Sequence, residues 1–109
     1  MDSGVTLCPG GANLALTASE STSDLAALQG SVVMVWCDDQ DVYLSASPVS
    51  GAQTLVTGTA AASATALIAD RIGKGTKVLR RVGSDRYLVA KTVTGTGTLR
   101  IKVVSRGQQ

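Results

Sequence analysis

A strict alternation of polar and apolar residues runs through Thr98-Leu99-Arg100-Ile101-Lys102-Val103. Successive side chains of a β-strand point to opposite faces, so this period of two is typical of a strand with one covered face and one face in water. The three apolar side chains would face a core, while Arg100 and Lys102 would face solvent. The segment therefore predicts a β-strand in a sheet that is covered on one side.

Other segments are apolar or alternate in the same way and are bounded by turns rich in Gly, Asp or Ser, which is the pattern of short strands. We expect these strands at 13–17, 30–37, 42–46, 77–82 and 87–93, with a weaker one near Leu55-Val56. The Ala-rich stretch 60–72 is compatible with a short helix, but the surrounding pattern favours an extended conformation. Gly-containing turns at 83–86 and 94–97 predict that the last three strands form a meander.

The length of 109 residues is that of one ordinary domain. Seven or eight short strands in a chain of this length predict an all-β fold, a single small antiparallel β-sandwich or barrel with a jelly-roll or Greek-key-like strand order. We expect this domain over residues 13–107. Residues 1–12 are Gly-rich and lack alternation, so they are expected to form an N-terminal arm.

The composition excludes several kinds of chemistry. The chain contains no His, which rules out a His-based triad, a His metal ligand and a His pH switch. Phe is absent and only 3% of residues are aromatic, so the core must consist of Val, Leu, Ile and Ala.

The first residues lack the order of a signal peptide, and no apolar run approaches the roughly 18 residues of a membrane helix, which predicts a soluble protein. Cys8 and Cys37 are then expected as reduced thiols.

The net charge of +2 hides a strong division along the chain. All ten Lys and Arg lie between Arg71 and Arg106, whereas seven of the eight acids precede Arg71. Residues 1–70 therefore carry −7, and residues 71–109 carry +9 because Asp85 is their only acid. We expect the two groups of charge to pair with each other, either within one chain or between subunits.

The strand around Val32–Cys37 departs from simple alternation because every residue in it is apolar. Both of its faces then need cover, although an antiparallel sandwich leaves one face of each sheet in water. Either the N-terminal arm or the 47–63 loop folds over the second face, or a neighbouring subunit covers it. Met34 and Trp36, which share one face, are typical interface residues and indicate cover by a neighbouring subunit.

A second departure is Arg80-Arg81, which lies inside a predicted strand. Consecutive side chains point to opposite faces, so one guanidinium points the same way as the core residues. A buried guanidinium without a partner is too costly to retain. We expect a β-bulge, a position at the rim of the sheet, or a carboxylate partner. The seven acids of residues 1–70 are the candidates for that partner, especially Asp38, Asp39 and Asp41.

The remaining motifs indicate turns rather than a reaction. The acidic segment 38–41 has typical turn formers and lacks the spacing of an EF-hand loop. Gly73-Lys74-Gly75-Thr76 is similar to a phosphate loop, but it leads into a strand, and Ile68 stands where that motif has its first Gly. Tyr87 is the only aromatic residue of the basic third, so we do not expect nucleic acid as a partner. We assign no catalytic, cofactor-binding or metal-binding residue and expect neither enzyme activity nor a cofactor.

The order of several segments resembles one known family. These segments are Leu16-Thr17-Ala18-Ser19, Leu28–Val35, Asp41-Val42-Tyr43-Leu44, Gly73–Arg80, Tyr87–Ala90 and Gly95–Ile101. From about Asn13 to Gly107, this layout resembles the small β-sandwich virion proteins of tailed bacteriophages, including capsid decoration or cement proteins. The family carries no catalytic residues, so none is transferred to this chain.

The resemblance implies a structural virion protein that is assembled in the host cytoplasm and sits on the outer capsid surface. It also implies a homo-oligomer, with a trimer favoured, that contacts the major capsid protein and stabilises the shell through many repeated contacts, without a membrane. The alternatives are a tail, fibre or head-tail joint protein, and a small carbohydrate- or nucleic-acid-binding module. We expect the subunit or capsid interface to include Val5, Leu7, Met34, Trp36, Arg80 and Arg81.

Overall fold

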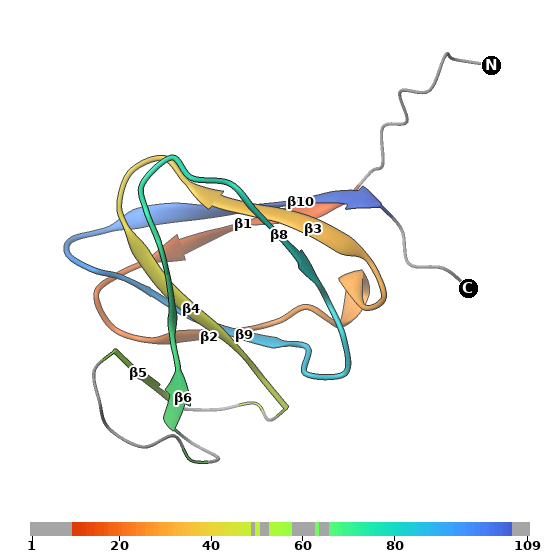
Figure 1. Cartoon of the computed structure of the whole chain (residues 1–109), viewed down its shortest axis with the longest axis horizontal. Helices are drawn as coiled ribbons and strands as arrows, with labels where there is room; N and C mark the ends of the chain where they lie inside the picture. The colour runs from red at the N-terminus through yellow and green to blue at the C-terminus, as the bar shows by residue number, and fades with distance from the viewer. Residues whose placement is uncertain (1–9, 49, 51–52, 58–62, 64–65, 106–109) are drawn as a thin grey trace.

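The computed structural model describes residues 10–48, 50, 53–57, 63 and 66–105. Within these residues the chain forms ten strands and one short 3₁₀ turn, and eight of the strands lie in two sheets that pack face to face (Figure 1). The molecule is a β-sandwich and not a closed barrel, which confirms the all-β expectation and decides between its two forms.

Each sheet has four antiparallel strands. The first sheet has the order β1-β10-β3-β8, and the second has the order β2-β9-β4-β7. The strands of the first sheet are β1 (Gly11–Leu16), β10 (Gly97–Ser105), β3 (Val32–Cys37) and β8 (Val78–Arg81). Those of the second are β2 (Ser21–Asp24), β9 (Tyr87–Thr92), β4 (Val42–Ser47) and β7 (Asp70–Ile72). The remaining elements are the parallel pair β5 (Thr54–Val56) and β6 (Ala66–Ile68), and the 3₁₀ turn η1 (Ala26–Leu28).

The pairing of the strands follows a simple rule. Each of the four early strands pairs with one of the four late strands in reverse order, as β1 with β10, β2 with β9, β3 with β8 and β4 with β7. The eight strands therefore follow a long two-stranded ribbon that is folded over on itself, which is the jelly-roll order. β5 and β6 lie next to β4, in the connection at the closed end of this ribbon (Figure 1).

The predicted meander of the last three strands is wrong. β8 pairs with β3, β9 lies in the other sheet between β2 and β4, and β10 lies between β1 and β3. The turns at 83–86 and 94–97 carry the chain from one sheet to the other, so they do not join hydrogen-bonded neighbours. Alternation identifies a strand and its apolar face, but consecutive strands can place these faces across a core as well as side by side.

The core consists of the inward side chains of both sheets. In β10 the apolar residues Leu99, Ile101 and Val103 are buried while Arg100 and Lys102 are exposed, as the alternation predicts. The side chains packed with them are aliphatic or small, and include Leu16, Val33, Val35, Cys37, Val42, Leu44, Ile72, Val82 and Ala90. The described part of the core therefore has the Val, Leu, Ile and Ala character that the composition requires. The buried Cys37 is a free thiol, and Cys8 lies outside the described residues.

Several boundaries differ from the predictions. β1 begins at Gly11, two residues earlier than expected, and Gly11 adopts φ +152°, where a side chain would collide with the carbonyl oxygen of Ile101. The sequence does not predict β2, because all four of its residues are polar. In the stretch 60–72, β6 and β7 are extended, as the prediction favours, whereas residues 60–62, 64 and 65 lie outside the described part.

Salt bridges connect the acidic and basic parts of the chain. Each of the five in the described residues joins an acid from residues 1–70 to a base from residues 71–109. They are Lys91–Glu20 at 3.2 Å, Arg86–Asp24 at 3.0 Å, Arg100–Asp38 at 3.6 Å, Arg71–Asp41 at 2.8 Å and Arg80–Asp70 at 3.7 Å. Most of these groups are exposed, so each pair stabilises the fold only a little, but together they cancel much of the charge division within one chain.

Glu20 forms the least exposed of these pairs and connects three segments. One carboxylate oxygen, Oε2, accepts hydrogen bonds from the backbone N–H of Leu55 at 3.1 Å and from Lys91 Nζ at 3.2 Å. Burial alone would raise the pKa of Glu20, but these hydrogen bonds, together with one from its own backbone, outweigh burial and lower the pKa from its ordinary value of 4.5. The ionised carboxylate thus links the chain just before β2 to β9 and β5.

Replacing Leu99, a fully buried residue of β10, should show how much the aliphatic core contributes. We expect Leu99→Ala to lower the free energy of unfolding by about 2–5 kcal/mol, because it removes buried methyl groups and leaves a cavity. Urea denaturation measures this loss. Leu79→Ala is the control, since Leu79 is 57% exposed, and equal losses in the two variants would contradict the assignment of the core face.

The lowered pKa of Glu20 predicts a pH-dependent contribution to stability. A depressed carboxyl pKa stabilises the folded state above the unfolded pKa, and this contribution is lost as pH falls through the folded pKa. The difference in urea midpoint between the natural protein and Glu20→Gln should be clear at pH 7 and should shrink well below the ordinary pKa of 4.5. A difference that stays constant from pH 7 to about pH 3 would contradict a role for the ionised carboxylate.

Candidate functional site

The outer face of the first sheet, which points away from the core, carries an unusual set of side chains. Along β3, Val33, Val35 and Cys37 are buried in the core, whereas the alternate residues Val32, Met34 and Trp36 lie half-buried on the other face. The side chains of this fully apolar strand therefore alternate between the two faces of the sheet. Those that point away from the core, Val32, Met34 and Trp36, form an apolar row on the outside of the sandwich.

Neighbouring strands extend this row in both directions. Met34 lies opposite Leu79 of β8 on one side and Lys102 of β10 on the other, and Leu79 is 57% exposed. Trp36 lies opposite Arg100, and the ammonium group of Lys77 sits 5.1 Å from the centre of the indole ring. Directly opposed residues of an antiparallel pair share a face, so an apolar centre is bordered by cations.

We call this surface the basic face. Its members share the outward side of β3, β8, β10 and the residue just before β8. They are Val32, Met34, Trp36, Lys77, Leu79, Arg81, Arg100 and Lys102.

The positive charge of this face is not cancelled to the same extent as elsewhere. Among the described residues, four of the nine cations form no salt bridge with a carboxylate: Lys74, Lys77, Arg81 and Lys102. Three of these four belong to the basic face, and its remaining cation, Arg100, is 3.6 Å from Asp38 at the end of β3. Ion pairing within the chain therefore leaves most of the unpaired positive charge around Met34 and Trp36.

The two consecutive arginines lie on opposite sides of the first sheet, as the period of two predicts. Arg80 lies opposite the buried Val33, and Arg81 lies opposite the outward Val32. Both remain exposed because β8 is the edge strand, so the inward arginine reaches water past the open edge. This corresponds to the expected position at the rim of the sheet.

One of the two arginines pairs with an acid of residues 1–70, as expected, but its partner is not one of the three favoured aspartates. Asp38, Asp39 and Asp41 bind neither of them; Arg80 pairs with Asp70 of the opposite sheet, and Arg81 donates a hydrogen bond to the Gly30 carbonyl oxygen at 3.2 Å. The acidic turn lies at the far end of β3 from Arg80 and Arg81, because antiparallel pairing places the end of β8 beside the start of β3.

Each aspartate of the acidic turn has a structural contact of its own. Asp38 pairs with Arg100, and Asp39 accepts a hydrogen bond from the backbone N–H of Thr98 at 3.3 Å. Asp41 accepts hydrogen bonds from Arg71 at 2.8 Å and from the backbone N–H of Lys74 at 2.7 Å, and these contacts lower its pKa. In the part of the chain that the structure describes, no three His, Cys, Asp or Glu residues are grouped so that they could hold a metal ion.

A cavity of about 190 Å³ opens between the two sheets beside β8 and β4. Its floor is apolar and includes Val35, Leu44 and Ile101, while arginines and aspartates stand at its mouth. Three arginines line the cavity. Arg80 is paired with Asp70, and Arg86 belongs to a closed network. Arg81 forms no salt bridge, but it is already counted in the basic face. The mouth therefore offers no concentration of unpaired charge comparable with that of the basic face.

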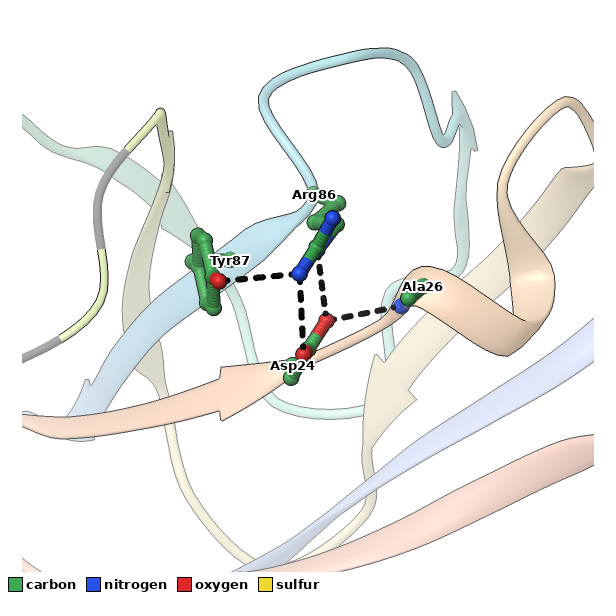
Figure 2. A network of polar contacts seen from close by, with 4 residues as sticks. All are labelled: Asp24, Ala26, Arg86 and Tyr87. Carbon is green, nitrogen blue, oxygen red and sulfur yellow. Dashed lines mark hydrogen bonds and ion pairs between the residues drawn. The ribbon is translucent and has the colours of Figure 1, made fainter.

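Figure 2 shows this network at the end of β2. Asp24 Oδ1 accepts hydrogen bonds from Arg86 Nε at 3.0 Å and from the backbone N–H of Ala26 at 2.9 Å. Arg86 also donates to the Tyr87 hydroxyl at 3.0 Å, and its guanidinium lies 5.0 Å from the centre of that ring. The hydrogen bond and the charge of Asp24 raise the pKa of Arg86. Through these contacts, Asp24 and Arg86 connect β2, η1 and β9.

The structure brings together three of the six predicted interface residues. Met34, Trp36 and Arg81 share the basic face, Arg80 lies on the other side of β8, and Val5 and Leu7 lie outside the described residues. The prediction missed Lys77, Leu79, Arg100 and Lys102. The alternation at 98–103 already turns Arg100 and Lys102 away from the core, but only the strand order shows that they flank β3.

The second side of β3 was expected to be covered by the arm, the 47–63 loop or another subunit. The part of the loop that forms β5 packs beside β4 of the opposite sheet and so does not lie over the basic face. Of the expected arm, Gly11 and Ala12 belong to β1 and pair with β10, and residues 1–9 lie outside the described part. Cover by a partner therefore remains a prediction for this face.

No protein-family model, curated protein or solved structure matches the chain. Among the described residues there is also no helix of the length and apolarity needed to cross a membrane.

Substituting Trp36 should affect association more than folding. We expect Trp36→Ala to lower the free energy of unfolding by about 1 kcal/mol, because the ring is half-buried and packs outside the core. Asp39→Ala should cost about 0.5 kcal/mol or less, since its carboxylate is exposed and accepts one long hydrogen bond. Thermal unfolding measures both variants; a loss for Trp36→Ala as large as that for Leu99→Ala would place the ring in the core instead.

Proposed function

We propose that the chain is a non-catalytic structural protein of a tailed-phage virion, a capsid decoration protein, that binds the major capsid protein through the basic face. The observation that carries the proposal is the apolar row Val32, Met34, Trp36 and Leu79, bordered by unpaired cations. A protein interface usually has a centre that is poor in charged residues and rich in aromatic residues and Met, surrounded by a polar rim. Jelly rolls also serve as capsid domains, although the same fold serves as a lectin, so the proposal rests on the face rather than on the fold.

The chemistry expected of the proposed partner follows from the residues of this face. An apolar patch with an acidic border would bury Trp36 and Leu79 and meet the charges of Arg81 and Lys102. Burial contributes about 25 cal/mol per Å² of apolar surface, while the charges mainly set specificity and the rate of association. Repeated over a shell, a modest contact of this kind stabilises the assembly by multivalency.

Quantitative mass spectrometry of purified virions tests the proposed role. A decoration protein is expected at a copy number comparable with that of the major capsid protein, since it occupies repeated positions on the shell. A tail, fibre or joint protein would be present in far fewer copies. Absence of the protein from the particles would refute both virion roles.

A specific observation favours a second candidate, single-stranded nucleic acid. Trp36 lies among four cations on one surface, and stacking on an aromatic ring beside a basic groove is a common mode of such binding. Against it, Lys77 already lies against the ring, and the other two aromatic residues, Tyr43 and Tyr87, belong to the second sheet. A gel shift at low salt separates the candidates, since a protein-binding face should give no shift.

Reversing charge on the basic face should weaken capsid binding. We expect the double variant Arg81→Glu/Lys102→Glu to bind capsids at least about tenfold more weakly, because two unpaired cations become anions facing an acidic border. Co-sedimentation with capsids that lack the protein measures the affinity, and raising the salt should narrow the difference.

Lys74→Glu is the matched control. Lys74 also lacks a salt bridge, but it lies in the turn between β7 and β8, outside the basic face. Its reversal should leave binding nearly unchanged. If it weakened binding as much as a single reversal at Arg81, a general attraction to net charge would replace the proposed contact.

A further inference from the structure

The two sheets of the sandwich end in four edge strands, β1 and β8 in the first and β2 and β7 in the second. Edge strands have unpaired backbone groups, and proteins commonly protect them with charged side chains. β8 carries Arg80 and Arg81, β7 carries Asp70 and Arg71, and β2 carries Asp24. β1 is the longest of the four, with six residues, and has no charged side chain.

The hydrogen bonding of β1 shows which of its groups face outward. The carbonyl oxygen of Gly10 accepts a hydrogen bond from the Val103 N–H at 3.1 Å, so Gly10 and Val103 form a hydrogen-bonded pair. In an antiparallel pair this bonding alternates along the strand, which turns the N–H and C=O groups of Gly11, Asn13 and Ala15 away from β10. Within the residues that the structure describes, no strand pairs with this side of β1.

We propose that β1 pairs with β1 of a second copy of the chain, antiparallel about a twofold axis, so that two four-stranded sheets become one sheet of eight strands. Such an isologous contact sets identical strands against each other. Self-pairing of β8 would place Arg80 and Arg81 close to their own copies, and like charges across a strand pair are destabilising. Self-pairing of β1 brings no like charges together, since all six of its side chains are uncharged.

The side chains of β1 fit the same contact. Gly11, Asn13 and Ala15 are small and exposed on the outer face, while Leu14 and Leu16 turn toward the core. Close approach of a second β1 therefore meets little steric resistance on the outer side. A twofold axis perpendicular to the joined sheet places both basic faces on one side of the dimer, whatever those faces bind.

Proline substitutions on the free side of β1 test the pairing. Proline lacks an N–H, and at positions 13 and 15 it would remove donors that point away from β10 while the β1–β10 ladder is kept. We expect the unsubstituted 109-residue chain to have the mass of two 11.1 kDa copies by light scattering, and Asn13→Pro/Ala15→Pro to have the mass of one at the same concentration. Asn13→Ser/Ala15→Ser, which keeps both donors, should remain a dimer.

A second variant keeps the test decisive if the proline variant fails to fold. Ala15→Lys adds a like charge to both copies of the exposed edge and should weaken dimerisation at least about tenfold without loss of the folded state. A natural chain that stays monomeric at every concentration would overturn the proposal, and slow hydrogen exchange at Asn13 and Ala15 would then show that another part of the chain covers the edge. A trimer, or a dimer that survives both the proline and the lysine substitutions, would also overturn it.

Discussion

The fold depends on one constraint, the pairing of each early strand with a late strand in reverse order. β1 with β10, β2 with β9, β3 with β8 and β4 with β7 together form the folded ribbon of a jelly roll. Because the early part of the chain is acidic and the late part is basic, this pairing brings opposite charges side by side. Glu20, Asp24 and Asp41 each bind a base carried on or next to the paired strand. Asp38 binds Arg100 of β10, the other neighbour of β3.

The same pairing decides which charges are left over. The cations that find no carboxylate are concentrated on the outer face of the first sheet, where Lys77, Arg81 and Lys102 border Met34 and Trp36. Most of the opposite charges that are separated along the sequence therefore pair with each other in the folded chain. The positive charge that finds no carboxylate lies mainly on one surface, the basic face. The net charge of +2 conceals this remainder, because an average over the chain does not show where charges lie.

The sequence predicted those features that depend on the residues of a single strand. The alternation at 98–103 predicts the buried and exposed sides of β10, and the apolar run at 32–37 predicts that β3 has a second face to cover. Which strands become neighbours depends on contacts across the core, so the predicted meander of the last three strands fails. β2 was missed for a related reason: its polar residues are held in place mainly by pairing with β9, which local pattern does not reveal.

The candidate site was predictable only in part, for the same reason. Met34, Trp36 and Arg81 could be expected at an interface from their own strands, whereas Lys77 and Leu79 join them only through the pairing of β3 with β8. Electron cryo-microscopy of the virion tests the account most directly. We predict density for this jelly roll on the capsid, with the sheet that contains β3 and β10 facing an acidic capsid surface. Density in which the opposite sheet, with β4 and β9, makes the contact would contradict it.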